Sequence, residues 1–441
     1  MNGKRDESPL EWITLGAFCA LLLISVVLDL PLLWALLAGL FIFLLYGRHR
    51  GFSWRALIGM CVEGIVTVKN VLTALLLIGI LTALWRAAGT IPLIVCRAAG
   101  FIRPSVFLLT TFLLNALVSV LTGTSFGTAA TMGVICAAMG KAMGVDIRLI
   151  GGAVLSGAFF GDRCSPVSTS ALLVAELTGT NIYDNLRRMA STALVPFALT
   201  CAAYGAISAM NAASADAPDL DAIFGAAFLL NWIAILPAGV LLAMAVLRFN
   251  VKIAMTASIL SALPVCMLLQ GMTPAQLAAT MILGYRSGSA EIGRMLDGGG
   301  IVSMLRVTGI VCLSSCFSGI FQKTGLLDGT KRAIERLSDR TTPYVATLCT
   351  SAVAGMIACN QTLAIMLTRQ LCGDLTDGGP RCAIDLEDTA VIVAPMVPWS
   401  IAGAVPLASV GAPVSAIPAA FYLFAIVLWR TAVSFAHRGR E

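Results

Sequence analysis

The stretches LTGTSFGTAATMG (121–133) and GAFFGDRCSPVSTSA (157–171) interrupt two apolar segments with glycine, proline, hydroxyl groups and charge. A similar pair, MIACNQTLAIM (356–366) and IVAPMVPWSIAGA (392–404), follows about 235 residues later. In lipid every backbone N–H and C=O group must be bonded internally, so irregular backbone at membrane depth persists only where it lines a cavity or a site. The pattern therefore predicts two helical hairpins with polar tips and two broken helices.

The composition is that of a membrane protein. Of the 441 residues, 58% are hydrophobic and 12% are charged, whereas soluble domains are about 25% charged. Mean hydropathy is +0.91, and apolar segments of about 17–25 residues recur, each long enough to cross a hydrocarbon core of about 30 Å. The net charge of +6 arises from basic residues spread between these segments, a pattern that argues against nucleic-acid binding. Thirteen cysteines without C-x-x-C spacing and only two histidines argue against a disulfide framework and a metal centre.

Hydropathy and helix-breaking residues predict an all-α polytopic fold. The expected helices are 12–28, 31–47, 53–68, 69–88, 104–121, 126–141, 149–180 (broken), 190–210, 222–247, 250–270, 273–288, 299–320, 344–358, 362–372, 387–408 (broken) and 411–436.

Landmarks that repeat along the chain predict an internal duplication. Glycines that end matching helices, prolines that precede the hairpins and prolines that break the later helices recur at offsets of 236, 239 and 232 residues. These pairs are Gly89 with Gly325, Pro104 with Pro343, and Pro166 with Pro398. Such paired interruptions mark the substrate site in many transporters.

We therefore expect three regions. The first transmembrane repeat covers 1–210, with its hairpin tip at 122–128 and its broken helix at 161–170. A linking loop and helix cover 211–247. The second repeat covers 248–441, with its tip at 358–362 and its broken helix at 394–400.

The handedness of the repeats depends on whether 53–68 crosses the membrane. If it crosses, seven crossings separate equivalent points and the repeats are inverted; if it lies on the surface, they are parallel. The loops around the first hairpin are more basic than those around the second, which favours inversion by the positive-inside rule. The acidic loop 211–221 and the basic C-terminal tail oppose that orientation.

The first hairpin tip is a candidate binding site. Glycine permits a tight turn and close approach to a ligand, while hydroxyl and carbonyl oxygens suit a hard cation. The alternative is a small-residue face for helix packing. Candidate residues are Thr122, Gly123, Thr124, Ser125 and Thr128, with Asn360, Gln361 and Thr362 as their counterparts in the second hairpin.

The first broken helix holds an acid in an apolar segment, which is costly and therefore points to function. Asp162 is the candidate ion ligand or proton carrier, because desolvation favours the proton whereas bound sodium favours the carboxylate. The alternative is a local Asp162–Arg163 pair that caps a half-helix. Further candidates in the broken helices are Ser165, Ser168, Thr169, Trp399 and Ser400, where Trp399 either closes the cavity or packs against it. Three other acids, Glu63, Glu176 and Glu387, are the next candidates for this role, but each lies near a segment end, which favours a position at the membrane interface.

The chain resembles the NhaC-type sodium/proton antiporter family. The resemblance rests on WRAAGTIP (85–92), LTGTSFGTAATMG, SGAFFGDRCSPVS (156–168), LEDTAV (386–391) and VAPMVPWS (393–400). Asp162 matches the acid of the family's Gly-Asp pair. Three positions depart from the family pattern: Thr169 follows Ser168 where an aspartate is usual, Asn360 replaces an acid, and Ser400 replaces an asparagine.

The resemblance implies two inverted repeats, each with a re-entrant helical hairpin and a broken transmembrane helix, in a multi-pass protein of the cell (inner) membrane. It also implies a homodimer in which a transport domain moves against a scaffold. The lipid bilayer and a small cation or solute are the expected partners, without nucleic acid and without a cofactor other than transported Na⁺. We expect any Na⁺ site at Thr124, Asp162 and Asn360.

Two functions remain open. One is exchange of Na⁺ for H⁺ with Asp162 as the titrating ligand. The other is Na⁺- or H⁺-coupled transport of a carboxylate or amino acid, because the neutral side chains Asn360, Gln361, Thr362, Ser168 and Thr169 suit hydrogen bonding to a solute. An enzyme or a channel is disfavoured, because the sequence has no nucleophile–base pair or phosphate loop and its polar residues form separate islands.

Overall fold

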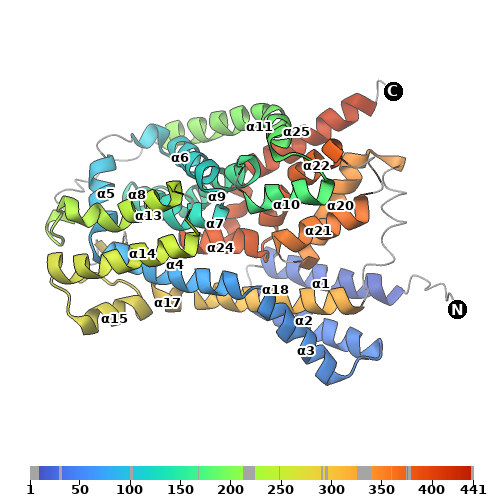
Figure 1. Ribbon diagram of the computed structural model, residues 1–441, viewed down its shortest axis with the longest axis horizontal. Helices are drawn as coiled ribbons and strands as arrows, with labels where there is room; N and C mark the ends of the chain where they lie inside the picture. The colour runs from blue at the N-terminus through green and yellow to red at the C-terminus, as the bar shows by residue number, and fades with distance from the viewer. Residues whose placement is uncertain are drawn as a thin grey trace.

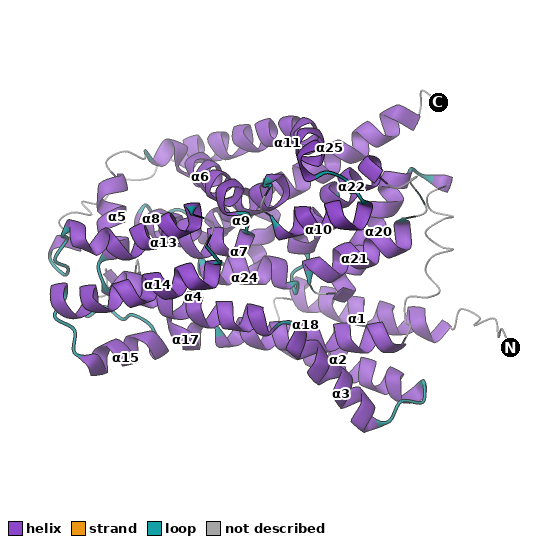
Figure 2. Ribbon diagram, in the orientation of Figure 1, coloured by secondary structure: helices purple, strands orange, loops and turns teal. Residues whose placement is uncertain are grey.

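The computed structural model describes residues 9–28, 32–99, 103–166, 168–211, 224–247, 249–289, 292–293, 296–324, 339–358, 360–373, 375 and 379–438. Within this part of the chain, every regular element is a helix and no strand forms (Figure 2). The sole β-type contact there is a bridge between Tyr285 and Gly298. The predicted all-α fold is confirmed.

The first half of the chain begins with α1 (Pro9–Val27), α2 (Leu32–His49), α3 (Trp54–Thr67), α4 (Lys69–Ala87) and α5 (Thr90–Ala99). It continues with α6 (Phe107–Thr122), α7 (Ser125–Thr128), α8 (Val134–Ala142), α9 (Ile147–Cys164), α10 (Thr169–Thr178) and α11 (Ile182–Asn211). A π-helical turn (Ala129–Gly133) joins α7 to α8.

The second half contains α13 (Leu236–Val246), α14 (Val251–Pro264), α15 (Pro274–Leu283), α17 (Gly300–Ser303) and α18 (Leu305–Thr324). It ends with α20 (Pro343–Ala358), α21 (Gln361–Cys372), α22 (Gly379–Asp388), α23 (Ala390–Val393), α24 (Ile401–Ser409) and α25 (Phe421–Arg438). Helices from both halves intermix, as where α11 packs along α25 and α4 along α14 (Figure 1).

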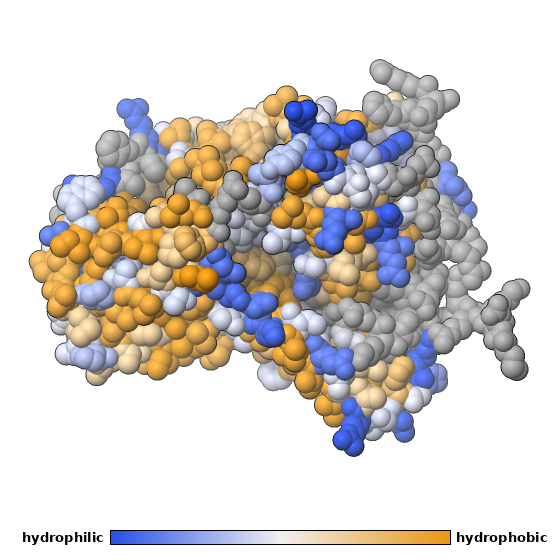
Figure 3. All heavy atoms as spheres, viewed as in Figure 1, coloured by the Kyte–Doolittle hydropathy of each residue, from blue (hydrophilic) through white to orange (hydrophobic). Residues whose placement is uncertain are grey.

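Among the described residues, five helices are long and apolar enough to cross a membrane: Lys69–Ala87, Pro104–Thr122, Ile182–Met210, Lys252–Leu269 and Gly300–Phe317. The helix pair Gly379–Met396 and Ile401–Ser409, bent by 57°, would make a sixth span. Large apolar side chains lie on the outside of the bundle; Leu194 is 71% and Leu268 is 87% exposed. Hydrophobic side chains also dominate the surface over α13, α14 and α15 (Figure 3). Such a surface is stable in lipid, where apolar exposure carries no cost.

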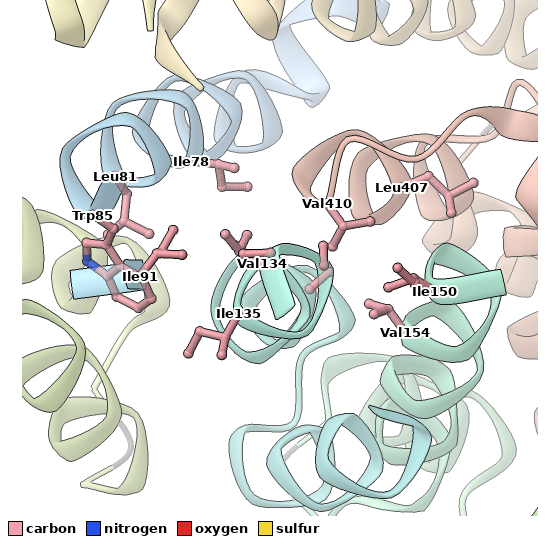
Figure 4. Packing of buried hydrophobic residues seen from close by; sticks show 14 of the residues in the cluster. Ile78, Leu81, Trp85, Ile91, Val134, Ile135, Ile150, Val154, Leu407 and Val410 are labelled. Atoms are coloured by element: carbon pink, nitrogen blue, oxygen red, sulfur yellow. The ribbon is translucent and has the colours of Figure 1, made fainter. Parts of the chain in front are cut away.

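The largest hydrophobic cluster joins α4, α5, α8, α9 and α24 (Figure 4). Trp85 is fully buried in it and donates a hydrogen bond from Nε1 to Ser258 Oγ, at 3.0 Å, which fixes α4 against α14. Glycines allow the closest helix contacts. A Cβ atom on Gly157 of α9 would lie 2.6 Å from the main-chain oxygen of Phe112 on α6. The core therefore depends on small residues as much as on large ones.

The predicted interruptions are present. Helix α6 ends at Gly123, which has a φ of 66°, and α9 ends before Ser165 and Pro166. Helices α20 and α21 meet at Asn360 and pack against each other. The second broken helix is interrupted between Val397 and Ser400. Of the two glycines expected to end matching helices, Gly89 follows α4 with a φ of 75°, and Gly325 lies outside the described residues.

Several predicted boundaries are wrong. Helix α5 was not predicted; it begins immediately after Gly89 and carries Pro92 in its first turn, where proline is tolerated. The segment 126–141 is not one regular helix, since the π-helical turn interrupts it. Helix α11 begins eight residues earlier than predicted, because the side chain of Asn181 accepts a hydrogen bond from the backbone N–H of Tyr183.

Three weaker segments also differ from the predictions. The segment 222–247 is not one helix, since residues 229–231 are irregular between Phe224 and α13. Helix α15 stops at Leu283, and Tyr285 then forms a bridge with Gly298 shortly before α17. The segment 53–68 forms α3, which has 14 residues and is shorter than each of the five candidate spans.

Candidate functional site

Asp162 lies in the last turn of α9 and is 3% exposed. Its Oδ1 accepts a hydrogen bond from Ser168 Oγ at 3.1 Å, and its Oδ2 accepts one from Gln361 Nε2 at 3.2 Å. The hydroxyl group of Ser170 donates to the main-chain oxygen of Asp162, at 3.2 Å. Among the described residues, no cationic side chain forms an ion pair with Asp162. Its carboxyl group is therefore buried among neutral donors.

The break between α9 and α10 creates this environment. Ser165 has an extended backbone, Pro166 follows it, and α10 begins at Thr169. Ser168 caps α10, because its Oγ accepts a hydrogen bond from the backbone N–H of Ala171 while donating to Asp162. The start of α10 thus lies beside the acid at the end of α9, and the positive end of a helix dipole favours negative charge.

The first tip is capped internally. Thr124 Oγ1 accepts a hydrogen bond from the backbone N–H of Gly127 at 3.3 Å, and the hydroxyl groups of Thr122 and Thr128 lie 3.3 Å apart. Ser125 is buried at the start of α7. Helix α7 packs against α9 and α24, so this tip contacts both broken helices.

The second tip reaches the first broken helix. Asn360 caps α21 by accepting a hydrogen bond from the backbone N–H of Thr362, at 2.9 Å. The amide of Gln361 donates both to Asp162 and to the main-chain oxygen of Val391, at 3.2 Å. Thr362 itself is exposed. Gln361 is thus the residue that joins the two halves at the acid.

The second broken helix places Trp399 inside the protein. Its Nε1 donates to the main-chain oxygen of Met356 at 2.9 Å, and its carbonyl oxygen accepts from Ser314 Oγ at 3.3 Å. These two hydrogen bonds connect the interruption of the second broken helix to α20 and α18. Ser400 caps α24 by accepting from the backbone N–H of Ala402. Of the two roles considered for Trp399, the contacts fit packing.

The structure brings together only some of the predicted site residues. Asp162, Ser168 and Gln361 are hydrogen-bonded to one another, and Ser165 donates to the main-chain oxygen of Val120 near the first tip. No hydrogen bond links Thr124 or Asn360 to Asp162 among the described residues, and each of their side-chain oxygens accepts one of the capping bonds described above. Thr169 is exposed.

The predicted alternative of an Asp162–Arg163 pair is wrong. Consecutive helical residues point in different directions, and Arg163, which is fully buried, forms an ion pair with Asp388 of α22. Its guanidinium group also donates to Thr192 Oγ1 at 2.6 Å and to the hydroxyl group of Tyr422 at 3.3 Å. Asp162 and Arg163 therefore belong to two different networks.

Sequence reasoning missed the rest of the charged network. Arg430 of α25 contacts Asp388 Oδ2 at 2.6 Å and Asp385 Oδ1 at 2.9 Å. With Arg163, these residues form an ion-pair cluster of two arginines and two aspartates that joins α9, α22 and α25. A signal was present, because Arg163, Arg430 and the acid-rich run 385–388 interrupt apolar segments, and charges in such segments need partners.

Glu387, which the sequence places at a segment end and favours for the membrane interface, lies inside the protein and not on its surface. Its side chain is completely buried. Neither carboxyl oxygen has a hydrogen-bond partner in the described structure. Glu63 and Glu176, by contrast, are exposed on the bundle surface.

Comparison with known proteins identifies the family. The family model described as "Na+/H+ antiporter family" matches residues 10–176 and 157–439. A malate-2H(+)/Na(+)-lactate antiporter of Bacillus subtilis is 30% identical over 406 residues, which cover 88% of this chain and 86% of the relative. The Na(+)/H(+) antiporter NhaC of Alkalihalophilus pseudofirmus is 27% identical over 425 residues, 93% of this chain and 92% of the relative. An arginine/ornithine antiporter, ArcD, of Halobacterium salinarum is 26% identical over 404 residues, 88% and 82% of the two chains. The predicted NhaC-type resemblance is confirmed, and the chain belongs to the Na⁺/H⁺ antiporter family of membrane transporters.

Proposed function

We propose that this transporter exchanges Na⁺ for H⁺ across the cell membrane and that Asp162 binds the two ions in turn. The observation that carries the proposal is a carboxyl group that is 3% exposed, lies in a helix break and is hydrogen-bonded to neutral donors alone. A buried carboxylate without a counter-charge is unstable and must bind either a proton or a cation. One group that can be neutralised in two ways provides the competition that exchange requires.

The surrounding oxygen atoms suit sodium as cargo. Hydroxyl oxygens of Ser168 and Ser170 lie within hydrogen-bond reach of Asp162, and hard cations prefer such oxygen ligands. Thr124 and Asn360 form no hydrogen bond with Asp162 in the described structure, but each side-chain oxygen accepts one capping bond and keeps a second lone pair that a cation can use. Their participation is therefore proposed for a conformation in which the two tips have moved toward Asp162.

The proposal includes an architecture of two inverted repeats, 1–210 and 248–441, each with a re-entrant hairpin and a broken helix. It is supported by the helix breaks at Gly123 and Asn360 and by those at Ser165 and Val397. We also propose a homodimer in which a transport domain moves against a static scaffold, as the resemblance to the family implies.

A second candidate is coupled transport of a carboxylate or an amino acid. The observation that favours it is the neutral second tip, where Asn360 and Gln361 offer amide groups close to Asp162. Two of the relatives are named for organic solutes, namely malate with lactate, and arginine with ornithine. Amide donors could hold the carboxylate of such a solute.

The test uses purified protein in sealed proteoliposomes with an internal pH dye. A pulse of Na⁺ should drive proton movement in the wild type and in Asp184→Asn, which alters an exposed acid of α11 and serves as the matched control. Asp162→Asn should abolish the movement, because an amide cannot take up a proton in exchange for Na⁺. If the wild type is folded and yields no Na⁺-driven proton flux, exchange is refuted. Counterflow of labelled lactate, malate, arginine or ornithine would then support the second candidate.

A further inference from the structure

Of the three acids on α22, Asp385 and Asp388 belong to the ion-pair cluster, whereas Glu387 has no hydrogen-bond partner in the described structure. It follows Leu386 on α22 and precedes Asp388, whose side chain is paired with Arg163 and Arg430. Both carboxyl oxygens of Glu387 are buried and lack a hydrogen-bond partner in the described structure. A buried polar group in this condition requires an explanation.

The charged groups around Glu387 come from two elements. Arg163, Cys164 and Asp162 of α9 interact with it electrostatically, as does its neighbour Asp388. Other charged or titratable side chains lie on the helices that pack against α22: Glu176 on α10, Asp184, Arg187 and Arg188 on α11, Tyr344 on α20, Arg369 and Cys372 on α21, and Tyr422 and Arg430 on α25. Glu176, Asp184, Arg187 and Arg188 are exposed, away from the buried carboxyl group.

The charges in the cluster already balance without Glu387. Two arginines, Arg163 and Arg430, are matched by two aspartates, Asp385 and Asp388. An ionised Glu387 would therefore add a negative charge in excess of the two arginines, and in the described structure no hydrogen-bond donor reaches its carboxyl oxygens. An isolated buried carboxylate is far more costly than a buried neutral carboxylic acid. In this conformation the stable form of Glu387 carries its proton.

Asp162 provides the connection to transport. It precedes Arg163, whose partner Asp388 follows Glu387, so the two acids flank the same buried ion pair, although no hydrogen bond joins their side chains in the described structure. An ionised Asp162 repels a negative charge on Glu387, and a cation bound at Asp162 would cancel that repulsion. Binding of Na⁺ would thus make it easier for Glu387 to release a proton.

We propose that Glu387 is a second proton-binding group of this transporter, separate from Asp162, which loses its proton to water when Na⁺ occupies the Asp162 site. In that step Na⁺ binds Asp162 that has already lost its own proton, the O–H bond of the Glu387 carboxyl group breaks, and water accepts the proton. The cation that arrives and the proton that leaves carry the same charge, so the net charge of the two acids and their ions does not change. The Na⁺-linked step rests on the proposed exchange function. That Glu387 is protonated in this conformation and can be titrated does not depend on the exchange function.

The first measurement is infrared difference spectroscopy of the full-length protein between acidic and alkaline pH. A protonated carboxyl group gives a carbonyl stretching band that disappears on ionisation. That band should be lost in Glu387→Gln, shifted in Glu387→Asp and unchanged in Glu176→Gln, the control that removes an exposed acid from α10. Identical carboxyl bands in the wild type and Glu387→Gln would overturn the proposal, whether or not the protein moves Na⁺.

The second measurement counts the protons released when Na⁺ is added to the weakly buffered, purified protein. Glu387→Gln should release fewer protons per bound Na⁺ than the wild type, and Glu387→Asp should restore part of the loss. Unchanged release in Glu387→Gln would overturn the Na⁺-linked step. A wild type that binds Na⁺ but shows no exchange refutes the proposed function alone, because both measurements on Glu387 still apply. If Glu387→Gln fails to fold, the shifted infrared band of Glu387→Asp decides the matter.

Discussion

Replacing Asp388 with asparagine should destabilise the protein strongly, because Arg163 would lose its ion pair. Both side chains of this pair are completely buried. Removing one partner of a buried ion pair leaves an uncompensated charge and costs about 3–5 kcal/mol. The remaining hydrogen-bond partners of Arg163 in the described structure are neutral: Thr192, Tyr422, Cys164 and the main-chain oxygen of Met189. They solvate the guanidinium group without neutralising it.

Asp385→Asn is the matched control, since it removes an aspartate from the same helix. Arg430 would keep its contact with Asp388 at 2.6 Å, and its side chain is 18% exposed. The loss is then one charged hydrogen bond, which is worth about 1.5–3 kcal/mol. Asp388→Asn should therefore be the more damaging change.

The assay is reversible unfolding in mixed micelles of rising SDS content, followed by loss of helical signal. Both variants should also be measured in a Glu387→Gln background, because the glutamine cannot ionise and replace the lost negative charge. Combining Arg163→Met with Asp388→Leu should recover much of the stability, because the pair is removed without stranding a charge. Equal losses for Asp388→Asn and Asp385→Asn in the Glu387→Gln background would refute the reasoning.

Two further changes test the helix contacts around Asp162. Gly157→Ala should lower the free energy of unfolding by about 1–3 kcal/mol, because the new methyl group would overlap the backbone of α6. The control Gly239→Ala should be neutral or stabilising, since no atom lies within 4 Å of the added Cβ. Equal effects of the two changes in the same SDS assay would contradict this. Ser168→Ala should cost about 0.5–2 kcal/mol through loss of the α10 cap, whereas Ser168→Thr keeps the hydroxyl group and should retain most of the stability in thermal unfolding.

Local signals in the sequence were sufficient to predict where the helices break. Glycine with a positive φ and proline act on their immediate neighbours, so Gly123 and Pro166 could be interpreted without knowledge of the fold. The same holds for the helix that begins at Pro343. Asp162 could also be selected, because an acid in an apolar segment is costly wherever that segment packs.

Contacts between distant segments could not be predicted in the same way. The pairing of Arg163 with Asp388 spans 225 residues, and the sequence alone offered Asp162 as the nearer partner. The burial of Glu387 depends on how other helices pack against α22, and a hydropathy profile does not show which helices are in contact. The π-helical turn at 129–133 is likewise hidden, since a run of small residues shows no periodicity.

The two networks at the end of α9 constrain how the transporter can move. Separating α9 from α22 would break the buried pair of Arg163 and Asp388, at the cost estimated above, so we expect α9, α22 and α25 to move together. The bond from Gln361 to Asp162 is different, because it joins an amide to a carboxyl group and breaking it strands no unpaired cation. When a proton or Na⁺ binds Asp162, the carboxyl group that accepts the hydrogen bond from Gln361 changes its charge, while the ion pairs of Arg163 and Arg430 stay intact. The contact between α21 and the end of α9 is therefore the place where ion binding can alter the structure at low cost.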